Sequence, residues 1–594
     1  MRSDLCGNVT ENKLNQQVEV CGWVDKRRDH GGVIFIDLRD HSGILQVVVE
    51  PDNAEAFKIA EDARYEYCLH VKGHVRSRPE GQANPNLKSG QIEVVVDNYE
   101  VLNKSKPLPF MLDEEAGEGI RLKYRYLDLR RPAMQKNIRL RSKLTRTLRN
   151  YLDDLEFLDI ETPMLTKATP EGARDFLVPS RVQQAKFYAL PQSPQLFKQL
   201  LMMSGMDKYY QIARCFRDED LRADRQPEFT QLDIEMAFVE QEDILQMAEG
   251  MIRKTYKEVL DVDLVNPFPR ITYADAMSRF GSDKPDLRID LELVDVADAL
   301  KSVEFKVFSA PANDPKGRVT VLKVPNGGKM SRKQIDDYAP FVARYGARGL
   351  AWIKVNEIEK GSAGLQSPIV KFLDDDAISA ILEKTQAQNG DLLFFGAGDY
   401  STVTQYMGEL RLKVGKDLGL VKEGWQPLWV VDFPMFDYNE DEKRWDAIHH
   451  PFTAAICDEK ELRENPGTAI SKSYDIVMNG VEIGGGSMRI HKKDVQSAVF
   501  DLLGISKEEA QVKFGFLIEA LRYGCPPHGG IALGLDRIAA LMCGVDSIRD
   551  VIAFPKTSSA SCTLTSAPSE IPDEQLREVH VQAIYPEIES EDDE

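Results

Sequence analysis

Five short runs of β-branched and aromatic residues fall within the first 105 positions. They are Val18–Val24, Val33–Leu38, Ile44–Val49, His70–Val75 and Ile92–Val96. Turn signals such as Gly31-Gly32 and Ser42-Gly43 separate several of the runs. The pattern therefore predicts an N-terminal all-β domain of five strands.

Five strands of this length are typical of an OB-fold, a barrel that commonly binds single-stranded nucleic acid. Phe35 and the basic runs Lys26-Arg27-Arg28 and Arg76-x-Arg78 favour that function. Two simpler interpretations stay open: a structural barrel without a ligand, and a Phe35 that packs in the barrel core.

A helical periodicity begins after the barrel. Leu140, Leu144, Leu148, Leu152 and Leu155 recur on one helix face, and the run from Phe157 to Pro163 predicts a strand behind it.

Ser193-Pro194-Gln195-Leu196-Phe197-Lys198 predicts another helix, with Ser193 as N-cap and Gly205 at its end. Gln195 and Lys198 then share a face near the positive helix end, which favours a carboxylate. The alternative is an ordinary exposed lysine.

Residues 216–235 predict two strands joined by a charged loop, Asp220 to Glu228. Alternation places Arg217 and Glu219 on one side, and it aligns a second row along one face. That second row is Phe229, Gln231, Asp233 and Glu235. A ring, a guanidinium and carboxylates on one sheet face suit a purine nucleotide and a small charged substrate. The alternative is a solvated hairpin.

Asn479-Gly480 is a strong hairpin signal that makes Asp475 and Glu482 diagonal neighbours. Two adjacent carboxylates need a cation or a raised pKa, and magnesium is the natural cation beside ATP phosphates; otherwise both face solvent. Gly484-Gly485-Gly486 and Arg489 follow. Strict alternation places Arg489 on the opposite face of the strand from Glu482. If both residues serve one site, we therefore predict a bulge in the glycine run or a shorter strand.

Bulk composition limits the class of protein. The 594 residues predict three or four domains, and 42% of them are hydrophobic, as in ordinary globular proteins. No apolar run suits a membrane helix or a signal peptide. Eight cysteines without a Cys-x-x-Cys pair fit a reducing cytosol. A net charge of −21 argues against indiscriminate nucleic-acid binding but allows a selective RNA partner.

Taken together, these segments resemble the three motifs of class II aminoacyl-tRNA synthetases, in the family's order. Leu140 to Pro163 resembles motif 1, Phe216 to Glu235 resembles motif 2, and Gly529 to Arg537 resembles motif 3. The resemblance covers nearly the whole chain and points to the bacterial-type aspartyl-tRNA synthetases.

The resemblance implies an α+β multidomain protein. Its expected parts are a five-stranded OB-fold anticodon-binding domain (1–105), a hinge (106–135), an antiparallel-sheet catalytic domain in two parts (136–287 and 421–585), a mixed α/β bacterial-type insertion (288–420) and an acidic tail (586–594).

The resemblance also implies ATP-dependent attachment of L-aspartate to tRNA(Asp), through aspartyl-adenylate and with Mg²⁺, by a cytoplasmic homodimer that needs no membrane. Arg217 and Arg537 are the catalytic candidates. The aspartate-binding candidates are Glu171, Ser193, Gln195, Lys198, Arg217, Gln231, Asp233, His449 and Arg489. The ATP-binding candidates are Arg217, Asp218, Glu219, Gln226, Phe229, Glu482, Gly534, Leu535, Asp536 and Arg537, and the metal candidates are Asp475 and Glu482.

For the anticodon, the candidates are Arg28, Phe35, Gln46, Arg76, Arg78 and Glu93. His30 with Gly81 looks like the non-discriminating type of relative, which also charges tRNA(Asn). His449-His450 invites a zinc interpretation, but no third ligand has suitable local spacing and we expect no zinc.

Two alternatives remain. One is a ligase for asparagine or lysine on the same scaffold. Arg489 with Lys198 argues for an acidic substrate, because asparagine would leave these cations unpaired. The other is a non-enzymatic relative, which would be expected to lack motif residues that are present here, namely Arg217, Glu219, Phe229 and Arg537.

Overall fold

The computed structural model describes residues 1–168 and 172–584, and the chain divides into two compact units. One unit combines Met1–Arg139 with Ile552–Ser569, and the other combines Leu140–Val551 with the segment from Glu570 onward. Among the described residues, no helix is long and apolar enough to cross a membrane.

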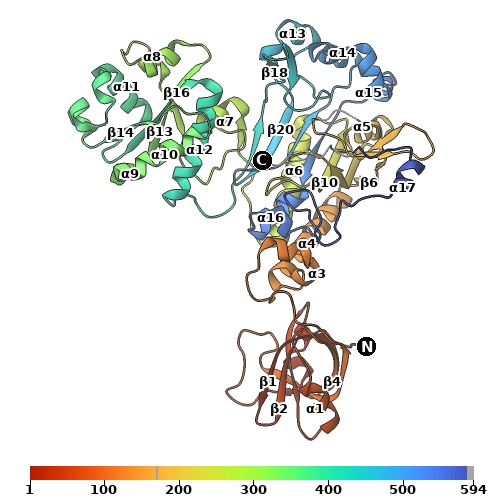
Figure 1. The fold of residues 1–594 in the computed structure, drawn as a ribbon. Coiled ribbons are helices and arrows are strands. Elements are labelled where there is room, and N and C mark those ends of the chain that lie inside the picture. Colours follow the sequence, from red (N-terminus) through yellow and green to blue (C-terminus); the bar gives the residue numbers. More distant parts are fainter. Residues whose placement is uncertain (169–171, 585–594) are drawn as a thin grey trace, which may run out of the picture. The chain divides into compact units, whose positions relative to one another are not determined.

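The N-terminal strands close into a barrel in the order β1-β2-β3-β5-β4, as in an OB-fold (Figure 1). Their bounds are β1 Gln17–His30, β2 Val33–Asp40, β3 Gly43–Val49, β4 Cys68–Ser77 and β5 Ile92–Asn103, with helix α1 (Ala54–Glu61) between β3 and β4. Alternate residues of each strand fill the core, for example Ile34 and Ile36 of β2. All five predicted strands are therefore confirmed, and most of them are longer than the sequence pattern indicated.

Three helices follow the barrel: α2 Glu118–Lys123, α3 Arg125–Asp128 and α4 Pro132–Asp154. Arg125 and Asp128 are both buried, and their ion pair is 2.6 Å long. On α4 the leucine stripe is buried at Leu144, Leu148 and Leu152, whereas Leu155 lies beyond the helix end and is exposed.

An eight-stranded sheet forms the scaffold of the larger unit, in the order β11-β17-β20-β21-β22-β10-β9-β6. The pairs are antiparallel except at the two edges, where β11 runs parallel to β17 and β6 parallel to β9. The bounds are β6 Leu158–Asp159, β9 Lys208–Phe216, β10 Glu228–Ala237, β11 Arg270–Thr272, β17 Pro427–Val431, β20 Ser473–Met478, β21 Val481–Met488 and β22 His528–Gly534.

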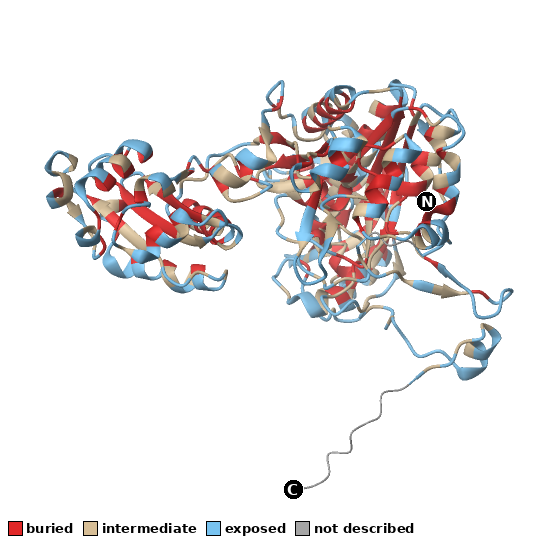
Figure 2. Ribbon diagram, turned by 90° about the horizontal axis from the view of Figure 1, so that it is seen from above, coloured by how far each residue is buried: buried red, intermediate tan, exposed pale blue. Residues whose placement is uncertain are grey.

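The helices beside this sheet include α5 Gln195–Met203, α6 Gln241–Leu260, α7 Tyr273–Phe280, α13 Glu459–Glu464, α14 Lys493–Leu502, α15 Lys507–Ala520, α16 Leu535–Cys543 and α17 Asp573–Glu578. Two small hairpins add β7 (Leu177–Pro179) with β8 (Phe187–Ala189) and β18 (Phe436–Asn439) with β19 (Arg444–Ala447). Buried residues follow the central strands, and exposed residues follow the outer helix faces (Figure 2).

A separate five-stranded sheet occupies the middle of the chain, in the order β12-β13-β16-β14-β15. Its strands are β12 Leu293–Asp295, β13 Gly317–Val324, β14 Ala351–Val355, β15 Leu365–Gln366 and β16 Leu392–Asp399. Helices α8 (Lys306–Asn313), α9 (Arg332–Asp336), α10 (Tyr338–Ala343), α11 (Asp375–Thr385) and α12 (Tyr400–Asp417) accompany it. Two apolar clusters share its strands, so the sheet has its own core.

Three local boundaries differ from the sequence expectation. Strand β9 ends at Phe216, so Arg217 and Glu219 lie in the following segment, where charged residues replace the apolar alternation. Strand β6 has only two residues, because it pairs at the sheet edge. Helix α5 begins at Gln195, with Pro194 rather than Ser193 as its N-cap.

Candidate active site and nucleic-acid face

A cavity of about 540 Å³ opens over the segments that resemble motifs 2 and 3 and over the hairpin of β20 and β21. Its lining includes Arg217, Glu219, Gln226, Phe229, Gln231, His449, Asp475, Glu482, Gly534, Asp536 and Arg537. Most of the sequence-predicted ATP residues are therefore brought together, although they come from segments more than 300 positions apart.

Arg217 is held at the edge of this cavity by its backbone. Its N–H donates to the carbonyl of Pro227 at 2.9 Å, which closes the loop between β9 and β10. Its guanidinium carbon lies 5.1 Å from the centroid of the Phe229 ring. The buried Nε atom of Arg217 makes no hydrogen bond within the described residues. A strong donor is thus available to a ligand beside an aromatic face.

Other predicted nucleotide residues divide into lining and supporting groups. Arg537 lines the cavity and donates to the Glu482 carbonyl at 3.2 Å. Asp536 accepts from the backbone N–H of Thr230 at 2.8 Å, which fixes α16 to β10. Asp218 lies 3.8 Å from Arg174 and, like the buried Leu535, is outside the cavity lining.

The second hairpin pairs Met478 with Val481 and Val477 with Glu482, as predicted from its Asn-Gly turn. The register then shifts by one residue, because Ile476 pairs with Gly484. We predicted a bulge that changes which face of the strand the later residues occupy, and the structure contains one. Its extra residue is Ile483, immediately before the glycines rather than among them.

Asp475 and Glu482 both line the cavity, and so does Asp283, which the sequence did not indicate. Burial raises the pKa of Asp475 well above its usual value, and repulsion from Glu482 and then Asp283 adds to the shift. A cation would relieve this repulsion, so the oxygen donors here fit magnesium. Among the residues that the structure describes, no group of three or more His, Cys, Asp or Glu side chains has metal-site geometry.

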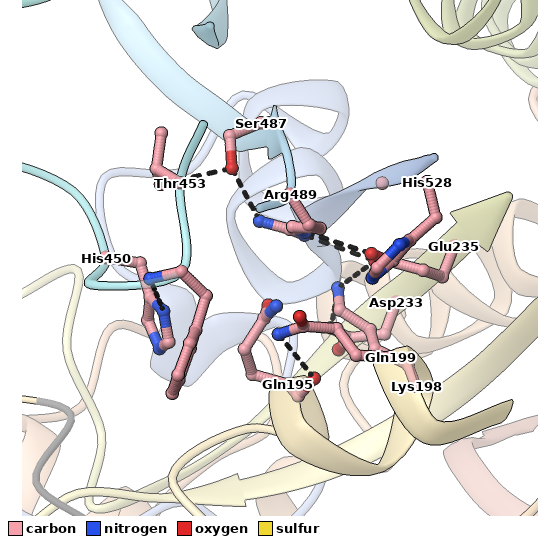
Figure 3. Close-up of polar contacts among 12 residues, drawn as sticks. Gln195, Lys198, Gln199, Asp233, Glu235, His450, Thr453, Ser487, Arg489 and His528 are labelled. Carbon is pink, nitrogen blue, oxygen red and sulfur yellow. Dashed lines mark hydrogen bonds and ion pairs between the residues drawn. The ribbon is translucent and has the colours of Figure 1, made fainter. Parts of the chain in front are cut away.

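Beside the cavity lies a buried group of four charged side chains, named here the charge quartet: Lys198, Asp233, Glu235 and Arg489 (Figure 3). Lys198 Nζ donates to Asp233 Oδ1 at 3.1 Å and lies 3.5 Å from Glu235 Oε2. Arg489 donates through Nε to Glu235 Oε1 at 2.9 Å and through Nη2 to Glu235 Oε2 at 3.2 Å. Their exposed fractions are 1%, 1%, 0% and 5% in the order named. Lys198 is therefore not the exposed lysine of the simpler interpretation.

The pKa values of the two carboxylates of the quartet shift in opposite directions, although burial acts to raise both. It raises the pKa of Asp233, and the charge of Lys198 only partly offsets this rise. For Glu235, Arg489 and then Lys198 outweigh the effect of burial, and they hold the pKa below its usual value. Asp233 Oδ2 and Gln195 Nε2 are buried and have no hydrogen-bond partner in the described parts of the chain.

The remaining aspartate candidates are less uniform. Ser193 Oγ accepts from the N–H of Gln195 at 3.3 Å, so it supports the start of α5. His449 packs edge-on against Phe433 at 4.4 Å between ring centroids. Enclosure of the ring, and then the charge of Arg489, lowers the pKa of His449 to about 4. The predicted Glu171 lies outside the described residues.

Sequence reasoning missed several neighbours of these residues. Tyr273 and Phe433 line the cavity, and no spacing signal marked either of them. Ser487 accepts from Arg489 Nη1 at 2.7 Å, which period-two alternation from Arg489 could have indicated. His528 is fully buried at the start of β22, beside the quartet (Figure 3).

On the barrel, Phe35 lies opposite Arg28, the first member of a polar network. Phe35 pairs in register with Arg28 and lies outside the core, so the core interpretation of this ring is wrong. Arg28 Nη2 donates to Gln46 Oε1 at 3.2 Å, and Gln46 Nε2 donates to Glu93 Oε2 at 2.8 Å. Arg76 Nε reaches the other Glu93 oxygen at 2.8 Å.

The three other barrel candidates occupy loop or edge positions. Arg78 Nε donates to the carbonyl of Ile92 at 3.0 Å. His30 ends β1 and is exposed, and its ring centroid lies 6.3 Å from that of Phe35. Gly81 is an exposed loop residue with φ of +80°, a conformation that favours glycine.

Comparisons with known proteins match this architecture. Residues 117–558 match the family described as tRNA synthetases class II (D, K and N), and residues 18–102 match the OB-fold nucleic acid binding domain. The letters stand for aspartate, lysine and asparagine. The first match covers most of the chain.

Solved structures with the same fold are distant in sequence. Asparaginyl-tRNA synthetase from Pyrococcus horikoshii, complexed with asparaginyl-adenylate, is 20% identical with a TM-score of 0.58, covering 93% of this chain and 98% of that one. The Entamoeba histolytica enzyme of the same name is 18% identical, with a TM-score of 0.57 over 91% and 95%. A protein of Leishmania major Friedlin, provisionally named an aspartyl-tRNA synthetase, is 19% identical with a TM-score of 0.57 over 92% of each chain. The chain therefore belongs to the class II tRNA synthetases of the aspartate, lysine and asparagine group, with an OB-fold anticodon-binding domain.

Proposed function

We propose that this synthetase attaches L-aspartate to tRNA(Asp), and also to tRNA(Asn). The observation that carries the choice of amino acid is that Lys198 and Arg489 are both buried and both contact Glu235. A planar guanidinium binds a carboxylate through two parallel hydrogen bonds, and Lys198 adds a second positive charge. Asparagine offers no charge to these cations.

The chemistry follows from the family. The α-carboxylate of aspartate attacks the α-phosphorus of ATP, pyrophosphate leaves, and aspartyl-adenylate remains. The terminal adenosine hydroxyl of tRNA then attacks the acyl carbon and loses its proton, the bond from that carbon to the phosphate oxygen breaks, and AMP leaves aspartyl-tRNA behind. Arg217 would bridge the α-carboxylate and the α-phosphate, and Arg537 would hold the γ-phosphate with adenine between it and Phe229. These steps depend on positioning and on neutralising phosphate charge.

Magnesium would be held by Asp475 and Glu482, where it would neutralise charge on the ATP phosphates. We expect Asp475→Asn to lower ATP–pyrophosphate exchange by more than about tenfold, because a metal ligand is lost. The same change should raise the melting temperature at neutral pH without ligands. A carboxyl whose pKa is raised on folding destabilises the folded state at pH values above its unfolded pKa, and Asn removes this cost. An unchanged melting temperature with normal exchange would contradict the assignment.

For the anticodon, Phe35 would stack on one base while Arg28, Gln46, Arg76, Arg78 and Glu93 contact phosphates and base edges. Phe35→Ala should weaken tRNA binding by about 1–3 kcal/mol, the usual contribution of one stacked base. Exchange of pyrophosphate without tRNA should stay normal, since Phe35 belongs to the barrel. Equal tRNA affinity in filter binding would remove Phe35 from the interface.

Charging of purified tRNA(Asp) and tRNA(Asn), side by side, tests the whole proposal. Aspartate on both tRNAs is the expected result. Aspartate on tRNA(Asp) alone would keep the enzyme but reject the inference from His30 and Gly81. No aspartate on either would reject the proposed function.

One observation favours the asparagine alternative. Asp233 Oδ2 is a buried oxygen without a donor among the described residues, and when ionised it could accept a hydrogen bond from the amide of asparagine. Arg489 and Lys198 weigh more heavily, because a guanidinium and an ammonium form stronger hydrogen bonds with a carboxylate than with a neutral amide.

We also propose a homodimer. Leu155, Leu158, Met164 and Leu165 follow α4 and are 37% to 53% exposed, which places apolar surface on the segment resembling motif 1. Light scattering should give twice the 67.0 kDa of one chain, and a monomer would contradict the proposal.

A further inference from the structure

The charge quartet is balanced before any substrate enters. Lys198 and Arg489 bring two positive charges, and Asp233 and Glu235 bring two negative charges when both are ionised. All four are at least nine-tenths buried. The charges of Lys198 and Arg489 are therefore already neutralised by the two carboxylates when both are ionised.

If the proposed function holds, the side-chain carboxylate of aspartate adds one negative charge next to this balanced group. An uncompensated charge in a site of low dielectric is costly, and proteins commonly avoid it by changing the protonation of a neighbour. The α-amino and α-carboxylate groups of the substrate cancel each other, so they leave the imbalance in place. A proton taken up on binding would restore neutrality.

The hydrogen bonds of the quartet indicate where that proton goes. Both oxygens of Glu235 accept from Arg489. Only Oδ1 of Asp233 is engaged, by Lys198, while its Oδ2 is buried and without a partner in the described residues. We infer that Asp233 takes up one proton when aspartate binds, and that its Oδ2–H then faces the substrate rather than a bare negative oxygen.

The groups that face Asp233 leave few other sites for this proton. Burial already raises the pKa of Asp233; Lys198 opposes this rise most, Glu235 adds to it and Arg489 opposes it. Tyr209 of β9 is buried and its pKa is raised, so it is already protonated. Burial lowers the pKa of His450 to about 3, with Arg489 and Lys198 adding to the shift. It also lowers the pKa of His449, to about 4, and that of His528.

This proton would allow the enzyme to discriminate between aspartate and its amide, asparagine. A neutral Asp233 can donate to a carboxylate, whereas an ionised Asp233 accepts from the NH₂ of asparagine and repels aspartate. Because a proton is taken up on binding, aspartate affinity must fall as pH rises. Above the pKa of free Asp233, the fall is about tenfold per pH unit, and asparagine affinity does not follow it.

Isothermal titration of aspartate into the full-length enzyme, near neutral pH in two buffers of different ionisation enthalpy, counts the protons directly. We expect uptake of about one proton per site. Asp233→Asn should bind aspartate without uptake, and its affinity should lose the pH dependence. Asp336→Asn, on the exposed side of α9, is the matched control and should behave as the unaltered enzyme.

The outcomes separate this inference from the proposed function. Aspartate binding without proton uptake overturns the inference and leaves the proposed function intact, whereas binding of asparagine but not aspartate overturns the proposed function. Uptake that persists in Asp233→Asn assigns the proton to another group. Should that variant fail to fold, infrared difference spectra of the unaltered enzyme with carbon-13-labelled aspartate decide the matter. A new carboxylic-acid band from the protein supports Asp233, and its absence contradicts it.

Discussion

Replacing Arg217 by alanine is expected to lower aspartate-dependent ATP–pyrophosphate exchange by about 10²–10³-fold, with the melting temperature unchanged. The range is that seen when one preorganised donor to a developing charge is removed. The physical reason is that Arg217 lies at the cavity edge and would bridge both reacting substrates, and its buried Nε has no hydrogen-bond partner among the described residues. The fold should tolerate the change, since its backbone bond to Pro227 remains.

Arg214→Ala is the matched control. Arg214 lies three residues earlier on β9 and contacts Thr230 and Glu228 at the exposed end of the hairpin. It lies outside the cavity lining, so its exchange rate should stay close to that of the unaltered enzyme. Equal losses in both variants would mean that the hairpin, rather than the Arg217 guanidinium, is responsible.

Arg489→Leu should remove aspartate activation and also destabilise the protein by about 3–5 kcal/mol. That cost is typical when one partner of a buried ion pair is deleted and the other charge stays behind, here Glu235. Chemical denaturation and exchange kinetics on the same sample give both quantities. A variant that is stable and active would remove Arg489 from the site.

A second variant separates the two effects of this substitution. Arg489→Leu with Glu235→Gln should recover much of the stability, because no unpaired carboxylate remains, but it should not recover activity. Arg463→Leu on the exposed helix α13, where Arg463 contacts Glu459 and Asp501, is the control and should change neither quantity. Recovery of activity in the double variant would show that Arg489 acts only through stability.

The features predicted best from the sequence were those set by local patterns, namely strand faces and hairpin register. Alternation correctly placed the row from Phe229 to Glu235 on one face, and the Asn479-Gly480 turn fixed the register of the second hairpin. The alternation conflict between Glu482 and Arg489 predicted a bulge in the glycine run or a shorter strand, and the structure contains a bulge, at Ile483 just before the glycines. Such features depend on neighbours in sequence, which a pattern records.

Contacts between distant segments were beyond the sequence pattern. Asp283 faces Asp475 only because the chain returns to the cavity before the central five-stranded sheet begins. The sequence suggested that Asp233 and Glu235 balance the cations Lys198 and Arg489, but no local pattern fixed that Glu235 pairs with Arg489, which lies 254 positions away. Strand β9 also ends earlier than the alternation suggested. Beyond Phe216 the backbone N–H of Arg217 bonds to the carbonyl of Pro227, which closes the loop instead of extending the strand.

The measurement that tests the central claim most directly is ATP–pyrophosphate exchange with aspartate, asparagine and lysine, each alone, with magnesium and without tRNA. The buried pair of Lys198 and Arg489 predicts exchange with aspartate only. Exchange driven by asparagine or lysine, and not by aspartate, would contradict the proposed substrate while leaving the chain in the same synthetase family.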